Sequence, residues 1–473
     1  MMLAAEGDRE ARPNGRWSTP ELPGILLHLC ALERATAHVI AGWVPKIGDL
    51  DEKLAVAAAL EDSMVRAVAL RQQALALLER DESRLTVNPL WVEPLRDLDC
   101  CGDPASVVEG IVQDARQFML SRYRELAASL DPLLDTRLTV TIGAATGKLS
   151  SEISSIGTPI LRRAGDVSFQ TALAAAWMAD SGPKVSIDDI LWRPIDRVPV
   201  PARPAGRKRP PTGVRGHFRK GSRLTLADIS GELNDNVMAE LSALELLCRS
   251  TYEHPKLPWS FHLALARHAT DEARHAAIFR RLLCANGIDE STLTQHGANY
   301  EYAYEFPECE VGSERELLWR LLILCTVLEA LAIDKLPVEI AGRDFVGQAD
   351  FARALDYIAT DELFHTENGL RLTRGLCDQL NLDPMLERER VHGRFFGRQR
   401  DVRVEYLEAD AERAAAEIKM LEAPDPDGVP YSSRTEVELR LRASFTMAEC
   451  EQVERWQYNP IQHELLRNVA GSK

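Results

Sequence analysis

The sequence predicts an all-α protein whose centre is a four-helix bundle with one long crossover. Apolar residues recur at spacings of three and four through most of residues 21–190 and 231–380, which is the period of a helix. Four long helical patterns fall in the second region, at about 231–251, 258–286, 313–341 and 349–380. The connection inside each pair is short, whereas the stretch from Gly287 to Gly312 separates the pairs, as in a bundle with one crossover.

The ends of these helices carry recognisable signals. Ser313 and Glu316 form a capping-box pattern at the start of the third helix, in which each side chain satisfies a free backbone amide. Glycine is typical of the position after a helix C-terminus, so Gly287 is predicted to end the second helix and Gly342 the third.

Composition limits the kinds of protein that the chain can be. With 473 residues, 45% hydrophobic and 27% charged, it has the make-up of an ordinary globular protein of two to three domains. The formal net charge of −16 argues against a general nucleic-acid binder. The nine cysteines include no CxxC pair, and the first residues contain no signal-peptide pattern. We therefore expect a cytoplasmic protein that neither spans a membrane nor carries disulfides.

The chain is expected to have five parts. An N-terminal helical domain and a C-terminal helical extension flank the bundle, with a helix expected at 384–421 in the extension. Packing or oligomer contacts are the expected role of the extension, and a homodimer is one assembly that it allows. The parts are a disordered leader (1–20), the helical domain (21–192), a Pro/Arg-rich linker (193–223), the bundle (224–380) and the extension (381–473).

The linker is basic in an otherwise acidic protein. It contains six prolines and ten Lys or Arg residues against one acid, Asp196. A solvated linker that lies along the acidic body is one interpretation. A docking strip for an anionic substrate or partner is the other.

Two short strings predict a metal site. ATDEARH (269–275) and ATDELFH (359–365) each contain ExxH within a helical pattern. Three residues advance a helix by about 300°, so the glutamate and the histidine of each string share one face. Both side chains can therefore bind the same metal ion.

A lone glutamate precedes each string by a similar distance. Glu240 lies 32 residues before Glu272, and Glu329 lies 33 residues before Glu362. This spacing suits a carboxylate in the middle of one helix that faces the middle of its antiparallel neighbour. The repeated hairpin predicts six metal ligands, of which the four carboxylates are also the expected catalytic groups: Glu240, Glu272, His275, Glu329, Glu362 and His365.

The donor set indicates which metals are expected. Glu329 lies in the apolar run LLILCTVLEALAI, where an unpaired carboxylate would be costly. Two divalent ions would neutralise four carboxylates. Oxygen donors with one imidazole per ion favour iron or manganese over zinc, and no cysteine stands in the pattern. The alternative is that these six are ordinary core and surface residues.

Neighbouring polar residues are candidates for orienting the ligands. Asp271 and Asp361 precede the glutamates of the two strings and are expected to accept hydrogen bonds from the non-ligating nitrogens of the histidines. Arg274 is expected to pair with one of these aspartates, whereas Phe364 takes its place in the second string. His268, one turn before Glu272, is a candidate for an extra ligand or proton carrier.

Four further residues are candidates for a place near the site. Glu245 and Asp334 are expected to be polar partners rather than ligands. Tyr302 and Tyr304 lie in the crossover. Their side chains are expected either near the metal ions or on the protein surface.

The paired strings, DEARH above all, resemble the ferritin-like superfamily. Within it the resemblance is to the non-haem di-iron oxygenases and oxidases, the small subunits of ribonucleotide reductase, a tRNA-modifying hydroxylase and bacterial ferritin-like families, over about 150 residues. The resemblance implies a centre of two iron ions, with manganese or a mixed pair as alternatives, and O2 as co-substrate.

The N-terminal helical domain resembles a degenerate ferritin-like hairpin. Glu33 takes the place of the lone glutamate, but Val65 stands where relatives tend to carry histidine. No metal site is expected there.

The predicted function is therefore that of an O2-activating di-iron oxygenase or oxidase, which hydroxylates, desaturates or N-oxygenates a small molecule. No flavin or dinucleotide motif is present in the sequence, so electrons are expected from a separate donor, from the substrate or from peroxide. A ferroxidase or metal-storage protein and a non-catalytic helical scaffold are the alternatives.

Overall fold

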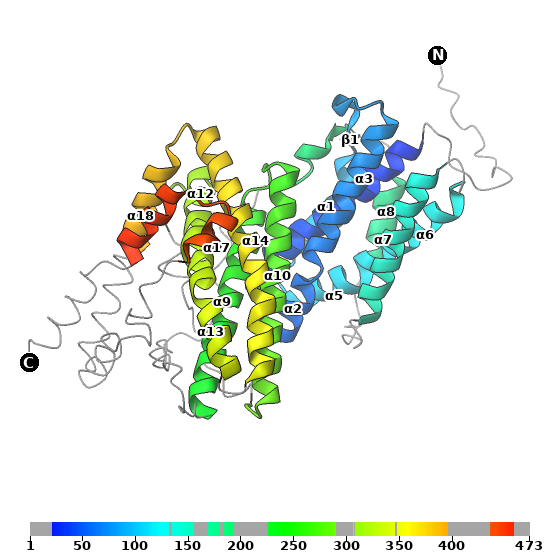
Figure 1. The fold of residues 1–473 in the computed structure, drawn as a ribbon. Helices are drawn as coiled ribbons and strands as arrows, with labels where there is room; N and C mark the ends of the chain where they lie inside the picture. Colours follow the sequence, from blue (N-terminus) through cyan, green and yellow to red (C-terminus); the bar gives the residue numbers. More distant parts are fainter. Residues whose placement is uncertain are drawn as a thin grey trace, which may run out of the picture. The chain divides into compact units, whose positions relative to one another are not determined.

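The computed structural model describes the chain at residues 21–131, 135–155, 169–179, 183–192, 226–289, 306, 308–345, 348–395 and 436–457. These residues are predominantly helical (Figure 1). The described strands, β1 (Thr86–Val87) and β2 (Val185–Ser186), form one antiparallel pair of two residues each. The prediction of an all-α protein is confirmed.

The chain divides into two compact units. Unit 1 consists of Met1–Pro201 and Leu247–Thr270, and unit 2 consists of Ala202–Leu246 and Asp271–Lys473. The predicted leader and the predicted Pro/Arg-rich linker lie outside the described residues.

Unit 1 is built from short and medium helices around one long apolar helix. Its α-helices are α1 (Leu22–Trp43), α2 (Leu50–Ala57), α3 (Leu60–Leu77), α4 (Glu93–Asp99), α5 (Pro104–Glu109), α6 (Arg116–Ser129), α7 (Thr136–Ser155) and α8 (Phe169–Met178). A π-helical turn, η4 (Gly110–Ala115), joins α5 to α6, and the short 3₁₀ turns are η1 (Val44–Lys46), η2 (Glu82–Arg84), η3 (Pro89–Val92) and η5 (Ile187–Asp189).

Helix α1 is buried on nearly every side, as expected for a helix that is apolar all round. With its adjoining turn, Leu22–Lys46, it is long and apolar enough to cross a membrane. The core helix of a soluble protein passes the same test, and 89% of this helix's most apolar stretch is buried inside the protein. Helix α1 is therefore weak support for a membrane span.

Unit 2 contains the predicted bundle helices and the C-terminal segments. The second stretch of unit 1 takes in the end of α9 (Leu226–Glu253) and the start of α10 (Trp259–Ala285), and the rest of both helices belongs to unit 2. The other elements of unit 2 are α12 (Glu314–Ile323), the π-helical turn η7 (Leu324–Leu328), α13 (Glu329–Phe345), α14 (Ala349–Leu380), a helix over 384–395, α17 (Val437–Arg442) and α18 (Met447–Gln457).

The predicted helix ends can be compared with these bounds. The Ser313 hydroxyl accepts a hydrogen bond from the Glu316 amide at 3.2 Å, and Glu316 accepts one from the Gly312 amide at 2.7 Å, so the capping signal acts as predicted. Gly287 follows α10 with a φ of 71°. The prediction for Gly342 was wrong, because α13 continues to Phe345. A glycine inside a helix weakens it without ending it.

The third bundle helix contains a π-helical turn that the sequence did not predict. This turn, η7, ends one residue before Glu329 and adds a residue to the helix there. Helix α14 comes close at this point, because a Cβ placed on Gly369 would lie 2.4 Å from the sulfur of Cys325. Only glycine at position 369 allows this approach.

The C-terminal segment is held on α13 and α14 by charge and by apolar packing. The Arg440 Nε donates to Asp334 Oδ1 at 2.9 Å, and both side chains are buried. Ala330, Ile333 and Leu370 pack with Ala443, Phe445 and Cys450 in one cluster. The predicted packing role of this segment holds within 436–457, and the predicted helix at 384–421 lies outside the described residues beyond 395.

Candidate metal centre

The six predicted ligands come together in space. Helix α9 supplies Glu240, α10 supplies Glu272 and His275, α13 begins with Glu329, and α14 supplies Glu362 and His365. All are buried except Glu240, whose side chain is 16% exposed. Each sits in a long amphipathic helix, so its direction is fixed by the helix period and not by a loop.

One group of potential ligand atoms surrounds His275. Donor atoms of Glu240, Glu272, His275 and Glu362 all lie within 4.8 Å of one another. His275 Nδ1 is 3.7 Å from a Glu240 oxygen, 3.9 Å from a Glu272 oxygen and 3.6 Å from a Glu362 oxygen. One nitrogen therefore faces three carboxylates.

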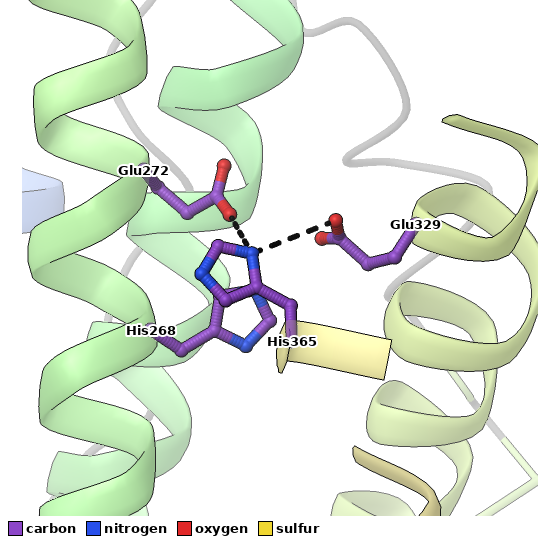
Figure 2. A group of neighbouring side chains, drawn as sticks. All are labelled: His268, Glu272, Glu329 and His365. Carbon is purple, nitrogen blue, oxygen red and sulfur yellow. Dashed lines mark ion pairs between the residues drawn. The ribbon is translucent and has the colours of Figure 1, made fainter. Parts of the chain in front are cut away.

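A second group surrounds His365. Its members are His268, Glu272, Glu329 and His365, with donor atoms again within 4.8 Å (Figure 2). His365 Nδ1 is 3.1 Å from a Glu272 oxygen, 3.8 Å from a Glu329 oxygen and 3.9 Å from a Glu362 oxygen. Oxygens of Glu272 and Glu362 thus approach both histidines.

The two aspartates bind the histidines crosswise. Asp361, next to Glu362, lies 3.1 Å from His275 Nε2, and Asp271, next to Glu272, lies 3.2 Å from His365 Nε2. An ionised carboxylate only accepts hydrogen bonds, so each Nε2 donates its proton. Each Nδ1 is thereby turned toward the carboxylates. The predicted histidine–aspartate bonds are present, but each aspartate serves the histidine of the other string.

Arg274 joins the two aspartates. Its guanidinium lies 2.7 Å from Asp271 Oδ1 and donates to Asp361 Oδ2 at 2.8 Å. The sequence predicted a pair with one aspartate, and the structure has both. Phe364 occupies the matching position of the second string, so this arginine has no counterpart in that string.

The close approach of the buried carboxylates raises the pKa values of two of them. Burial and the neighbouring Glu272 raise the pKa of Glu240 to about 8. Burial and the neighbouring Glu329 raise the pKa of Glu362 well above its usual value. Burial opposes the charge on His275, but the hydrogen bond to Asp361 and the nearby carboxylates of Glu240 and Glu272 raise its pKa well above the usual value. Without a metal ion, protons must offset the charge of this cluster.

These residues fit a pair of metal ions. His275 Nδ1 and Glu362 Oε2 are buried and make no hydrogen bond to any described residue. Two ligands of one ion, each bound at about 2.1 Å, lie ~3–4 Å apart, which matches the separations around both histidines. Four carboxylates would balance two divalent ions, and the hydrogen-bonded Nε2 atoms leave Nδ1 as the metal-binding nitrogens.

The remaining predicted residues lie elsewhere. Glu245 is fully buried and Asp334 pairs with Arg440, and neither belongs to the two ligand groups. Tyr302 and Tyr304 are outside the described residues.

The N-terminal counterpart of the site holds an arginine. Glu33 is fully buried on α1, where Arg66 donates to it from Nε at 2.7 Å and Tyr123 donates to it at 2.9 Å. Arg66 also pairs with Glu152 at 2.8 Å. In unit 1 the lone glutamate is thus neutralised by a guanidinium. The sequence pattern pointed to Val65, whereas the residue that neutralises Glu33 is the next one, Arg66.

The comparisons with known proteins add a family without an assigned activity. A family model described as "Protein of unknown function (DUF455)" matches residues 167–420, more than half of the chain. No curated protein and no solved structure matches the chain.

Proposed function

The chain belongs to the DUF455 family, and we propose that its helices α9, α10 and α12–α14 form a ferritin-like four-helix bundle that activates O2 at a pair of iron ions. The bundle would consist of α9, α10, the α12–η7–α13 helix and α14. The activity would be that of an oxygenase or oxidase acting on a small molecule.

The observation that supports this proposal most strongly is the arrangement of donor atoms. Each of the two histidines turns Nδ1 toward three of four buried or partly buried glutamates, of which Glu272 and Glu362 are shared, and each is hydrogen-bonded through Nε2 to an aspartate. A purely structural cluster of four adjacent carboxylates is costly, since their mutual repulsion must be offset by protons. Divalent ions offset it at neutral pH.

Each residue then has a defined part. Glu240 and His275 would hold one ion, Glu329 and His365 the other, and Glu272 and Glu362 would reach both. Two ferrous ions held by these residues would supply two electrons to O2, which is the chemistry that oxidation or hydroxylation of a substrate requires. Burial of the cluster excludes water from it.

An anaerobic titration with Fe(II) followed by exposure to O2 tests the proposal. We expect two Fe(II) per chain and an absorption change that depends on O2. Glu329→Ala should abolish binding of at least one ion. Glu245→Gln, a matched change of a buried glutamate in α9 outside both ligand groups, should leave two ions bound.

The outcomes separate the proposal from its alternatives. A chain that binds no more than background iron, or that binds two ions without a response to O2, contradicts O2 activation. Assembly into a large cage that takes up many iron ions per chain would indicate storage instead. If the chain binds two Mn(II) ions and still reacts with O2, the dimetal centre is supported but its metal is manganese.

A further inference from the structure

His268 stands on the same face of α10 as the ligand Glu272. The two residues are four positions apart in one uninterrupted helix, so about 40° and one turn separate their side chains. The division into units falls between Thr270 and Asp271, but the continuous helix fixes the relation of the two side chains.

The ring of His268 lies close to the second ligand group. His268 is buried, with 6% of its surface exposed, and one of its nitrogens is within 4.8 Å of donor atoms of Glu272, Glu329 and His365. Figure 2 shows its ring beside that of His365, with Glu272 and Glu329 on either side. Opposite ligands of one ion lie ~4.2 Å apart, so a separation of this size suits a shared ion.

The second string has no equivalent histidine. His268 comes four residues before Glu272, and the residue four before Glu362 is Ile358, which is also buried. The first group contains one imidazole, whereas the second contains two. The repeat therefore gives matched glutamates but unequal numbers of nitrogen donors.

We propose that His268 is a seventh ligand, which binds the ion held by Glu329 and His365 and makes the two ions chemically different. This assignment rests on the proposed dimetal centre. The ion beside His268 has an additional protein donor, and the ion held by Glu240 and His275 keeps more positions for exogenous ligands. Additional imidazole also favours later first-row metals at the His268 position, so an excess of a second metal should enter the two positions unequally.

Mössbauer spectroscopy of the full-length protein loaded anaerobically with ⁵⁷Fe(II) tests the assignment. The wild type should show two distinct iron environments. His268→Ile copies the residue at the matching position of the other string. This variant should lower the affinity for one iron ion by ~10-fold or more and leave the affinity for the other unchanged. His262→Gln, a change of another buried histidine of α10 outside both groups, should preserve both environments.

X-ray absorption of the iron-loaded wild type gives a second measurement that requires no variant. The spectrum should show three imidazole ligands in total for the pair of iron ions, rather than two imidazole ligands. If the wild type binds no iron, the proposed function and this inference both fail. If the wild type binds two ions but His268→Ile has the same affinities and the same Mössbauer spectrum, only the assignment of His268 is overturned. Two imidazoles per two ions in the absorption spectrum would overturn it as well.

Discussion

The crossed hydrogen bonds predict which metal ion each aspartate supports. Replacement of Asp361 by asparagine keeps the shape of the side chain but removes its charge. His275 Nε2 then loses its charged acceptor, whereas His365, which lies on the same helix as Asp361, keeps its own acceptor, Asp271. Loss of such a supporting acid typically lowers metal affinity 10- to 100-fold, about 1.4–2.7 kcal/mol.

The exposure of each aspartate side chain decides how large its loss of metal affinity should be within this 10- to 100-fold range. The Asp361 side chain is 17% exposed and that of Asp271 is 5% exposed. Water screens the first interaction more strongly. We therefore expect a loss of about 10-fold for Asp361→Asn and a loss closer to 100-fold for Asp271→Asn.

Double-mutant cycles on Fe(II) affinity, measured by anaerobic titration against a competing chelator, identify the ion concerned. Asp361→Asn should add little to His275→Ala, because both remove support from the same ligand, and its effect should add to that of His365→Ala. Asp271→Asn should show the reverse pattern. If each aspartate is instead coupled to the histidine of its own string, the crossed arrangement is refuted.

Four further outcomes follow from the structure. Arg274→Gln should lower the affinity for both ions by only about threefold, since its side chain is 39% exposed, and a loss confined to one ion in the same titration would contradict this. Burial raises the pKa of Glu240 to about 8, so the folded metal-free protein keeps a proton that the unfolded chain loses near pH 4.5. Thermal melts of the metal-free protein between pH 4.5 and pH 8 should therefore show a stability that decreases as the pH rises. With Mn(II) bound, this decrease should disappear. Gly369→Ala should cost about 1–3 kcal/mol in a denaturant titration, because its Cβ would overlap a neighbouring sulfur, whereas Gly147→Ala on α7 meets no atom within 4 Å and should cost nothing. Glu33→Gln should destabilise unit 1 by roughly 3–5 kcal/mol in urea, yet leave the metal content of the protein unchanged.

The sequence located the candidate ligands because they lie in long helices. A helix fixes the relative direction of residues three and four apart, so ExxH and the spacing to Glu240 and Glu329 were enough to predict which side chains meet. The helix bounds followed from the same period and from local caps such as Ser313.

The contacts that the sequence could not show depend on the distance between helices. Whether Asp271 turns to His275 or to His365 is decided by the placement of α14 beside α10, and no local pattern records it. Arg66 and Arg440 each neutralise a buried acid far away in the chain, Glu33 and Asp334. Such pairs leave no periodic signal in a single sequence.

The make-up of unit 1 bears on how the chain is synthesised and how it can be divided. Asp99 accepts hydrogen bonds from Trp43, Trp192 and Tyr252, and the ring of Tyr252 covers Gly42. Since Tyr252 belongs to the Leu247–Thr270 stretch of this unit, the ribosome must pass that stretch before the unit can close. A fragment that stops in the Pro- and Arg-rich region would leave the Asp99 carboxylate one donor short, inside an apolar core. Expression of residues 1–201 alone should therefore yield an incomplete core of unit 1.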